Sequence, residues 1–229
     1  DRGEGEAEMK GKLIVFEGTD GSGKATQTKL LVEALEQRGR AVRKLTFPRY
    51  DQDSSMLVRM YLNGDFGTDP NDVNPYAAST FYAVDRYASY KQDWGNWYET
   101  GGLVVTDRYT TSNAVHQAGK LPDGACQDYL QWLFHFEYDL MGLPRPDLVI
   151  YLDLPAELSA ALRRQREEST GQHADIHEAD AAYLRRCREN ALRVVAFAGW
   201  RRIDCSRDGA IRTPEEIHGE VWCLVAPLL

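Results

Sequence analysis

The stretch Leu13-Ile14-Val15-Phe16-Glu17-Gly18-Thr19-Asp20-Gly21-Ser22-Gly23-Lys24 joins an apolar run to a glycine-rich turn and a lysine. Residues 18–24 fit the pattern G-x-x-x-x-G-K, and the apolar positions within residues 26–38 recur at helical spacing. Between a buried strand and a helix, such a loop surrounds phosphate oxygens with backbone N–H groups, and the helix N-terminus adds positive potential. The stretch therefore predicts a phosphate-binding loop made of Gly18, Thr19, Asp20, Gly21, Ser22, Gly23 and Lys24. A glycine-rich turn with a chance lysine is the alternative, and the strand–helix context disfavours it.

The residue after the lysine departs from the usual pattern. Most phosphate-binding loops have Ser or Thr there, whose hydroxyl binds Mg²⁺, whereas this chain has Ala25. Thr26 follows, but one step along a helix turns a side chain by about 100°. We therefore expect a metal ion to depend on water or on carboxylates elsewhere, while Ala25 and Thr26 still border the nucleotide.

Outside the loop, apolar runs alternate with helical patterns. Strands are predicted at residues 13–16, 41–47, 103–106, 148–152 and 200–204, and helices at residues 26–38, 54–62, 73–97 (broken near Gly95), 124–141, 157–166, 179–198 and 214–225. Strands separated by helices imply a parallel sheet with helices on both faces, so the predicted fold class is α/β, a three-layer P-loop fold. We expect a disordered leader at residues 1–10 and a single domain at residues 11–229. The polar segment at about 164–178 is interpreted as a lid, with an ordinary surface loop as the alternative.

Composition limits the function. The 229 residues are 43% hydrophobic, enough for one sizeable core, and the formal net charge of −8 argues against a nucleic-acid-binding surface. No apolar run approaches the roughly 18 residues of a membrane span. The four cysteines contain no CxxC pair, which disfavours a zinc site; they are Cys126, Cys187, Cys205 and Cys223. We expect a cytoplasmic protein that binds neither nucleic acid nor membrane.

An acid and an arginine follow the predicted strand at residues 103–106. In enzymes with a phosphate-binding loop, an acid such as Asp107 at this place holds a metal ion or a water. The planar fork of Arg108 suits a phosphate group. A pair that caps the next helix is the alternative, and the presence of the phosphate-binding loop favours the first interpretation. Asp107 and Asp20 are the candidate metal ligands.

Further segments narrow the class: Phe47-Pro48-Arg49-Tyr50, Phe81-Tyr82-Ala83-Val84-Asp85-Arg86, Asp107-Arg108-Tyr109 with Ser112-Asn113, and Tyr151-Leu152-Asp153-Leu154. With the loop, they make the chain resemble the thymidylate kinases of the nucleoside-monophosphate kinase group from about residue 11 to residue 226. It is most similar to mycobacterial-type members, which share Phe-Pro-Arg-Tyr, Ser-Asn and the missing loop hydroxyl. The resemblance implies the sheet order 2-3-1-4-5, transfer of the γ-phosphoryl group of ATP to dTMP with Mg²⁺, giving dTDP and ADP, and a homodimer. Some of Trp94, Trp97, Trp132, Phe134 and Phe136 are candidates for a dimer interface, although core packing explains them equally well.

The resemblance also implies roles for residues of the acceptor site. Tyr82 would stack on thymine, and Arg86, four residues later on the same helical face, would contact the same ligand. Asn113, beside Ser112, would meet the base edge, and Asp20 would meet the deoxyribose hydroxyl or a metal-bound water. Arg108 would bridge the two phosphate sites, and catalysis would rest on Lys24, Arg108 and Asp20 through positioning and charge neutralisation. The monophosphate site would also contain Phe47, Pro48, Arg49 and Tyr50. From the residues alone, core aromatics at Phe81 and Tyr82 with a surface Arg86 are the alternative.

Two places depart from the family. His116 replaces a frequent Tyr that crowds the ribose 2′ position, so rejection of ribonucleotides would be looser or made in another way; an exposed helix histidine is the alternative. In the lid region, Arg166 is our first candidate for the arginine that approaches the transferring phosphoryl group, and Arg163 is the next, with a solvated basic helix end as the alternative. Asp175 and Glu178 resemble family acids near the acceptor site, or else cap a helix.

Other functions on the same architecture remain open at this point. A deoxynucleoside kinase acts on a hydroxyl and needs a base, whereas the second predicted strand ends in Phe47-Pro48-Arg49, with an arginine and no acid. A nucleotide-binding regulator or an inactive paralogue needs no acceptor site, and would leave Arg49, Tyr82, Arg86 and Asn113 unexplained.

Overall fold

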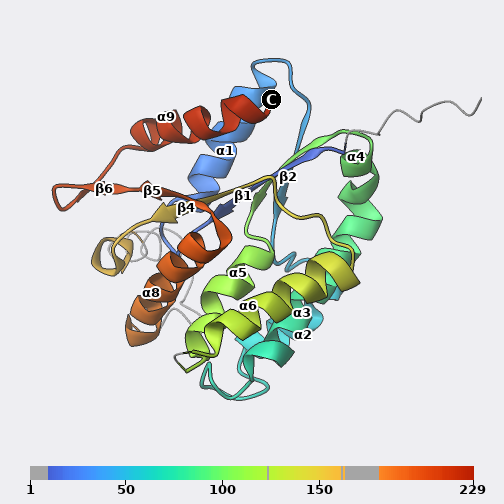
Figure 1. Cartoon of the computed structure of the whole chain (residues 1–229), viewed down its shortest axis with the longest axis vertical. Helices are drawn as coiled ribbons and strands as arrows, with labels where there is room; N and C mark the ends of the chain where they lie inside the picture. The colour runs from blue at the N-terminus through green and yellow to red at the C-terminus, as the bar shows by residue number, and fades with distance from the viewer. Residues whose placement is uncertain (1–9, 123, 161, 163–180) are drawn as a thin grey trace, which may run out of the picture.

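The computed structural model describes residues 10–122, 124–160, 162 and 181–229. A central twisted sheet lies between two layers of helices (Figure 1). Its strands run parallel in the order β2-β3-β1-β4-β5, which confirms the expected fold class and strand order. The strands are β1 (Lys12–Glu17), β2 (Val42–Thr46), β3 (Leu103–Asp107), β4 (Leu148–Asp153) and β5 (Arg201–Asp204).

The central strand β1 is buried on both faces, because strands and helices cover it on all sides. Ile14 and Phe16 belong to the core beneath helices α1 (Lys24–Glu36) and α9 (Pro214–Val225). Leu13 and Val15 alternate with them and enter the core on the opposite face. This burial explains why the strand reads as a continuous apolar run rather than as an alternating one.

The remaining helices of the described part cover mainly the face opposite α1 and α9 (Figure 1). They are α2 (Met56–Leu62), α3 (Pro75–Ser89), α4 (Gly95–Glu99), α5 (Thr110–His116), α6 (Cys126–Phe134) and α8 (Ala181–Ala198). Single 3-10 turns lie at Asp53–Ser55, Ala118–Lys120 and Ala226–Leu228. Within the described ranges, no helix combines the length and the apolar character needed to cross a membrane.

Both long predicted helices contain a π-helical segment. After α3, Tyr90–Trp94 is π-helical and α4 continues from Gly95; after α6, His135–Leu140 is π-helical. The predicted break near Gly95 is therefore a change of helical winding. A Cβ at Gly95 would lie 2.4 Å from the carbonyl oxygen of Tyr90, so only glycine fits there. Trp94 lies in this segment and is fully buried in the chain's own core, which excludes it from a dimer interface.

The structure differs from the predicted elements at one hairpin, and some predicted segments lie outside the described residues. The structure adds a two-stranded antiparallel hairpin, β6 (Ser206–Arg207) and β7 (Ala210–Ile211), which the sequence did not predict because two-residue strands show no periodicity. Residues 156–160 begin the helix predicted at residues 157–166. Apart from residue 162, the rest of that helix lies outside the described residues, as do the lid at 164–178 and the first nine residues of the leader.

The strand register brings three loops to one edge of the sheet. Phe16 of β1 and Thr46 of β2 both pair with Asp107, the last residue of β3. The segments that follow these strands therefore leave the sheet side by side. They are the phosphate-binding loop, the Phe47–Tyr50 segment and the Arg108–Tyr109 turn. The carboxyl ends of parallel strands are where open α/β sheets bind their ligands.

Candidate active site

The phosphate-binding loop is folded tightly around the side chain of its own lysine. Lys24 Nζ donates hydrogen bonds to the carbonyl oxygens of Gly18 (2.9 Å) and Thr19 (3.0 Å). A Cβ at Gly18 would lie 2.4 Å from Ser22 Oγ, so a larger residue would disrupt the loop. The buried hydroxyls of Thr19 and Ser22 have no hydrogen-bond partner among the described residues. The loop thus presents polar groups that a polyphosphate can satisfy.

The charge of Lys24 is held in a buried setting. Burial and the nearby Arg108 guanidinium lower the pKa of Lys24, while Asp20, Asp107 and Glu17 act in the opposite direction, leaving a net lowering. Additional negative charge from bound phosphates would favour the protonated form of this amine.

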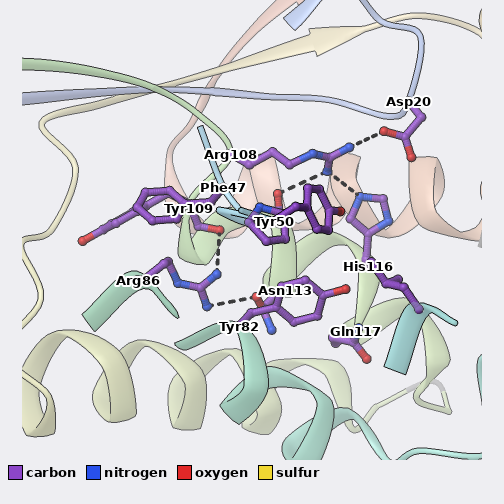
Figure 2. Close-up of a pocket in the computed structure, with 13 residues that line it drawn as sticks. Asp20, Phe47, Tyr50, Tyr82, Arg86, Arg108, Tyr109, Asn113, His116 and Gln117 are labelled. Carbon is purple, nitrogen blue, oxygen red and sulfur yellow. Dashed lines mark hydrogen bonds and ion pairs between the residues drawn. The ribbon is translucent and has the colours of Figure 1, made fainter. Parts of the chain in front are cut away.

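Arg108 connects the phosphate-binding loop to α5. Its backbone adopts a left-handed conformation (φ 69°), which is strained for a residue other than glycine and typical of functional positions. The guanidinium donates to Asp20, and its Nη1 lies 3.4 Å from Ser112 Oγ and 3.3 Å from His116 Nε2 (Figure 2). Burial alone lowers the pKa of Arg108, but Asp20 and Glu17 outweigh it and the net pKa is raised. The N-cap residue of α5 is Tyr109, and no side chain caps the helix there by a hydrogen bond. Neither Asp107 nor Arg108 therefore caps α5, and the capping alternative is wrong.

Figure 2 shows a single pocket that begins at Asp20 and extends between α3 and α5. Tyr82 and Asn113, predicted to contact the base, line it together with Arg108, predicted to contact phosphate. Its lining consists of Asp20, Phe47, Pro48, Tyr50, Leu62, Tyr82, Arg86, Arg108, Tyr109, Ser112, Asn113, His116 and Gln117. The peptide bond between Phe47 and Pro48 is cis.

Arg86 is almost completely buried, with 1% of its surface exposed, so the alternative of a surface arginine is wrong. Its Nε donates to Glu137 Oε2 at 2.8 Å, and its Nη2 donates both to Glu137 Oε1 and, at 3.0 Å, to Asn113 Oδ1. Burial by itself lowers the pKa of Arg86, but the charge and hydrogen bonds of Glu137 more than compensate, and the net pKa is raised. Arg86 is thus a permanent, rigidly held cation in the pocket wall.

Arg49 is held outside the pocket lining. Its backbone N–H donates to Asp85 Oδ2 (2.8 Å), its Nε to Asp85 Oδ1 (3.2 Å) and its Nη2 to Ser54 Oγ (3.0 Å). Ser54 in turn donates to Asp85 Oδ1 at 2.6 Å. Asp85 therefore fixes the Phe47–Tyr50 segment through both the backbone and the side chain of Arg49.

One buried carboxylate oxygen is available near the loop. Asp107 is 9% exposed, and its Oδ1 has no hydrogen-bond partner among the described residues. Oxygen ligands of this kind suit Mg²⁺. Asp20 is engaged by Arg108, and the described residues contain no group of three or more acids, histidines or cysteines that would hold a metal ion by themselves. Ala25 and Thr26 are both exposed on α1. The donor set fits a metal ion that takes most of its ligands from phosphates and water.

Several contributing residues were missed by the sequence analysis. Tyr109, Leu62 and Gln117 line the pocket; Gln117 lies four residues after Asn113, so the helical spacing of α5 was an available signal. Glu17, at the end of β1, accepts from the hydroxyls of Thr111 (2.8 Å) and Ser112 (2.7 Å). Asp85 lies in the quoted Phe81–Arg86 segment but was given no role, and nothing in the local pattern marked Glu137. The predicted residues Arg163, Arg166, Asp175 and Glu178 lie outside the described residues.

The sequence and the fold were compared with those of known proteins. The family model for thymidylate kinase matches residues 16–210 of the chain. The chain belongs to the thymidylate kinase family. As a member of this family it is an ATP-dependent nucleoside-monophosphate kinase, and the reaction of the family is phosphorylation of dTMP to dTDP.

Individual relatives agree with this assignment. A thymidylate kinase of Mycobacterium tuberculosis is 34% identical over 178 residues, which are 76% of this chain and 81% of the relative. A probable thymidylate kinase of Pyrococcus horikoshii is 33% identical over 218 residues, 95% of this chain and 97% of the relative. The solved thymidylate kinase of Candida albicans has a TM-score of 0.71 at 20% identity, covering 96% and 92% of the two chains, and supports the fold.

Proposed function

We propose that the pocket in Figure 2 binds dTMP and that the phosphate-binding loop binds the triphosphate of ATP. The observation that carries this proposal is the contact between Asp20, in the loop, and Arg108, in the pocket. This contact supports a role for Arg108 at the junction of the proposed triphosphate and monophosphate sites. In the same pocket, Tyr82 offers an aromatic face to a base, while Arg86 and Asn113 offer polar groups to its edge.

In the proposed reaction, a phosphate oxygen of dTMP attacks the γ-phosphorus of ATP. A new P–O bond forms as the bond to the bridging oxygen of ADP breaks, so one phosphoryl group moves and no general base is needed. Lys24 and Arg108 neutralise charge on the transferring group and hold the reactants in line. Mg²⁺, when bound, would neutralise charge on the donor phosphates; Asp107 would hold it directly or through water, with Asp20 as a second candidate.

The other expectations are part of the same proposal. Arg166 or Arg163 would approach the transferring group from the lid, and Asp175 and Glu178 would lie near the acceptor. We further propose that the protein is cytoplasmic and forms a homodimer. Exposed side chains on α3 support the dimer, since Tyr76, Val84 and Tyr87 are 40%, 48% and 38% exposed.

A panel of monophosphates tests the proposed function. With ATP and Mg²⁺, we expect dTMP to stimulate ADP release with a kcat/KM at least about tenfold above that of dCMP or dGMP, because the pocket wall presents hydrogen-bond donors to the base edge. A coupled assay of ADP formation measures it, with reactions lacking monophosphate as the control. Absence of stimulation by every monophosphate would show that this protein is not a monophosphate kinase.

His116 is expected to contribute to sugar selection. Its ring lies beside Arg108 in the pocket wall, 3.3 Å from Nη1. Replacing it with alanine opens space there, so the preference for dTMP over its ribose analogue should fall roughly tenfold, the scale on which pocket shape discriminates small groups. The ratio of the two kcat/KM values measures the effect. The matched control is His135→Ala, at an exposed histidine that pairs with Asp139 outside the pocket. An unchanged ratio in His116→Ala would exclude this role.

A further inference from the structure

Glu137 is a fully buried carboxylate that does not line the pocket yet controls two residues that do. Its exposed fraction is 0%. Its two oxygens accept from Arg86 Nε and Nη2 in a bidentate pair, and Oε2 also accepts from Thr110 Oγ1 at 2.5 Å. A bidentate guanidinium–carboxylate pair fixes the plane of the arginine as well as its position.

The π-helical winding of His135–Leu140 carries this carboxylate. A π-turn adds a residue relative to an α-helical turn, and therefore changes which side chains face the neighbouring elements. Here the carbonyl of Glu137 accepts from the N–H of Leu143 at 3.0 Å, while its side chain meets α3 and α5 through Arg86 and Thr110. π-turns are frequently found at functional sites.

The fixed Arg86 determines the orientation of the Asn113 amide. A guanidinium has donors and no acceptor, so the amide atom facing it must be the oxygen. Arg86 Nη2 donates to Asn113 Oδ1 at 3.0 Å, as Figure 2 shows. Asn113 Nδ2 is left as a donor, and it is buried without a hydrogen-bond partner among the described residues. Glu137 thus fixes Arg86, and Arg86 in turn fixes which amide atom of Asn113 is the acceptor and which is left as the donor.

Arg86 itself has a donor to spare. Of the five N–H groups of a guanidinium, two are taken by Glu137, one by Asn113 and one points to the carbonyl of Tyr109 at 3.4 Å. One N–H on Nη1 therefore remains for a ligand. Together with Asn113 Nδ2, it makes this part of the wall a surface of donors.

We propose that Glu137 is a positioning residue for base selection. By fixing Arg86, and through it Asn113, it orients the donors with which these two residues select a keto pyrimidine over an amino pyrimidine. This inference rests on the proposed function, in which the pocket binds dTMP. The O4 carbonyl of thymine has two lone pairs and can accept from both donors. The amino group at the same place in cytosine would set donors against donors, which disfavours that base.

The test is the base selectivity of Glu137→Gln, an isosteric change that removes the charge and turns one acceptor into a donor. We expect KM for dTMP to rise and the dTMP-to-dCMP ratio of kcat/KM to fall roughly tenfold, the cost of disturbing a hydrogen-bond set with a charged member. The dTMP-to-dUMP ratio should stay unchanged, because uracil presents the same O4. A loss of stability alone would not produce this pattern.

Asp153→Asn is the matched control. Asp153 is also buried, at 1% exposed. Its carboxylate accepts hydrogen bonds from Arg188 Nε (2.8 Å), Arg188 Nη2 (3.1 Å) and Arg202 Nε (2.8 Å), and none of these three residues lines the pocket. We expect Asp153→Asn to lower Tm as Glu137→Gln does, and to leave the dTMP-to-dCMP ratio of kcat/KM at the wild-type value. An unchanged ratio in folded Glu137→Gln would overturn the inference and leave the proposed function intact, whereas a wild-type enzyme that ignores dTMP would remove the proposed function itself.

Thr110→Val provides a second, milder variant. It removes one hydrogen bond to Glu137 Oε2 and keeps the ion pair with Arg86. If Glu137→Gln does not accumulate as folded protein, Thr110→Val decides the question. A fall of about two- to fivefold in the dTMP-to-dCMP ratio, with the dTMP-to-dUMP ratio constant, supports the inference, and an unchanged dTMP-to-dCMP ratio overturns it.

Discussion

Replacing Arg108 with alanine is expected to lower kcat for dTMP phosphorylation by about 10³-fold or more. Arginines that neutralise a transferring phosphoryl group contribute on this scale. Arg108 is already oriented for the task by Asp20, Ser112 and the strained turn at the end of β3. The loss should appear in kcat and in kcat/KM alike, because the interaction develops in the transition state. Steady-state kinetics with dTMP varied at saturating ATP measure both constants.

An exposed arginine provides the control for this change. Arg43→Ala also removes one positive charge, but Arg43 lies at the surface, where it pairs with Asp93, and kcat should stay within twofold of wild type. If Arg108→Ala raised KM and left kcat within tenfold of wild type, Arg108 would bind the ground state only, and its bridging role would be wrong.

Lys24→Met is expected to lower kcat by about 10²- to 10³-fold, the usual effect of losing one preorganised charge from a transition state. Methionine keeps the length and apolar character of the stem, so the loop should stay folded while the amine is lost. Single-turnover measurement of phosphoryl transfer separates this loss of chemistry from altered product release.

The same helix offers a control for Lys24. Lys29→Met changes an exposed lysine of α1 whose Nζ lies 3.8 Å from Glu33 Oε1. This variant should leave the rate of phosphoryl transfer as in wild type. A Lys24→Met enzyme that retained the wild-type single-turnover rate would contradict the catalytic assignment of the loop lysine.

The fold was predictable because its signals are local. The run Leu13–Phe16, the loop that follows it and the alternation of strands with helices depend on short-range periodicity, and the structure agrees with them. The π-helical segments at Tyr90–Trp94 and His135–Leu140 were not predictable, since each spans little more than one turn, which is too short to show a periodicity distinct from that of the α-helix it continues.

The site was predictable where a residue type implies its own chemistry. Lys24 and Arg108 were predicted in this way, whereas Tyr82 and Asn113 were predicted from the family resemblance; Tyr82, Arg108 and Asn113 all lie in the pocket lining. The acids that orient the arginines were missed, because an acid within a helix looks the same whether it faces solvent or a buried partner. Glu137 contacts Arg86 across 51 positions of sequence, and no local pattern encodes such a distance.

The paired arginines have a consequence for how substrate arrives. Each arginine on the acceptor side already has a carboxylate partner: Arg49 with Asp85, Arg86 with Glu137 and Arg108 with Asp20. With a net charge of −8, the chain therefore projects little positive field to draw in a dianion from a distance. Repulsion between like charges would lower the collision frequency, and added salt would weaken this repulsion. Selectivity among monophosphates would then reside in how long each remains after contact.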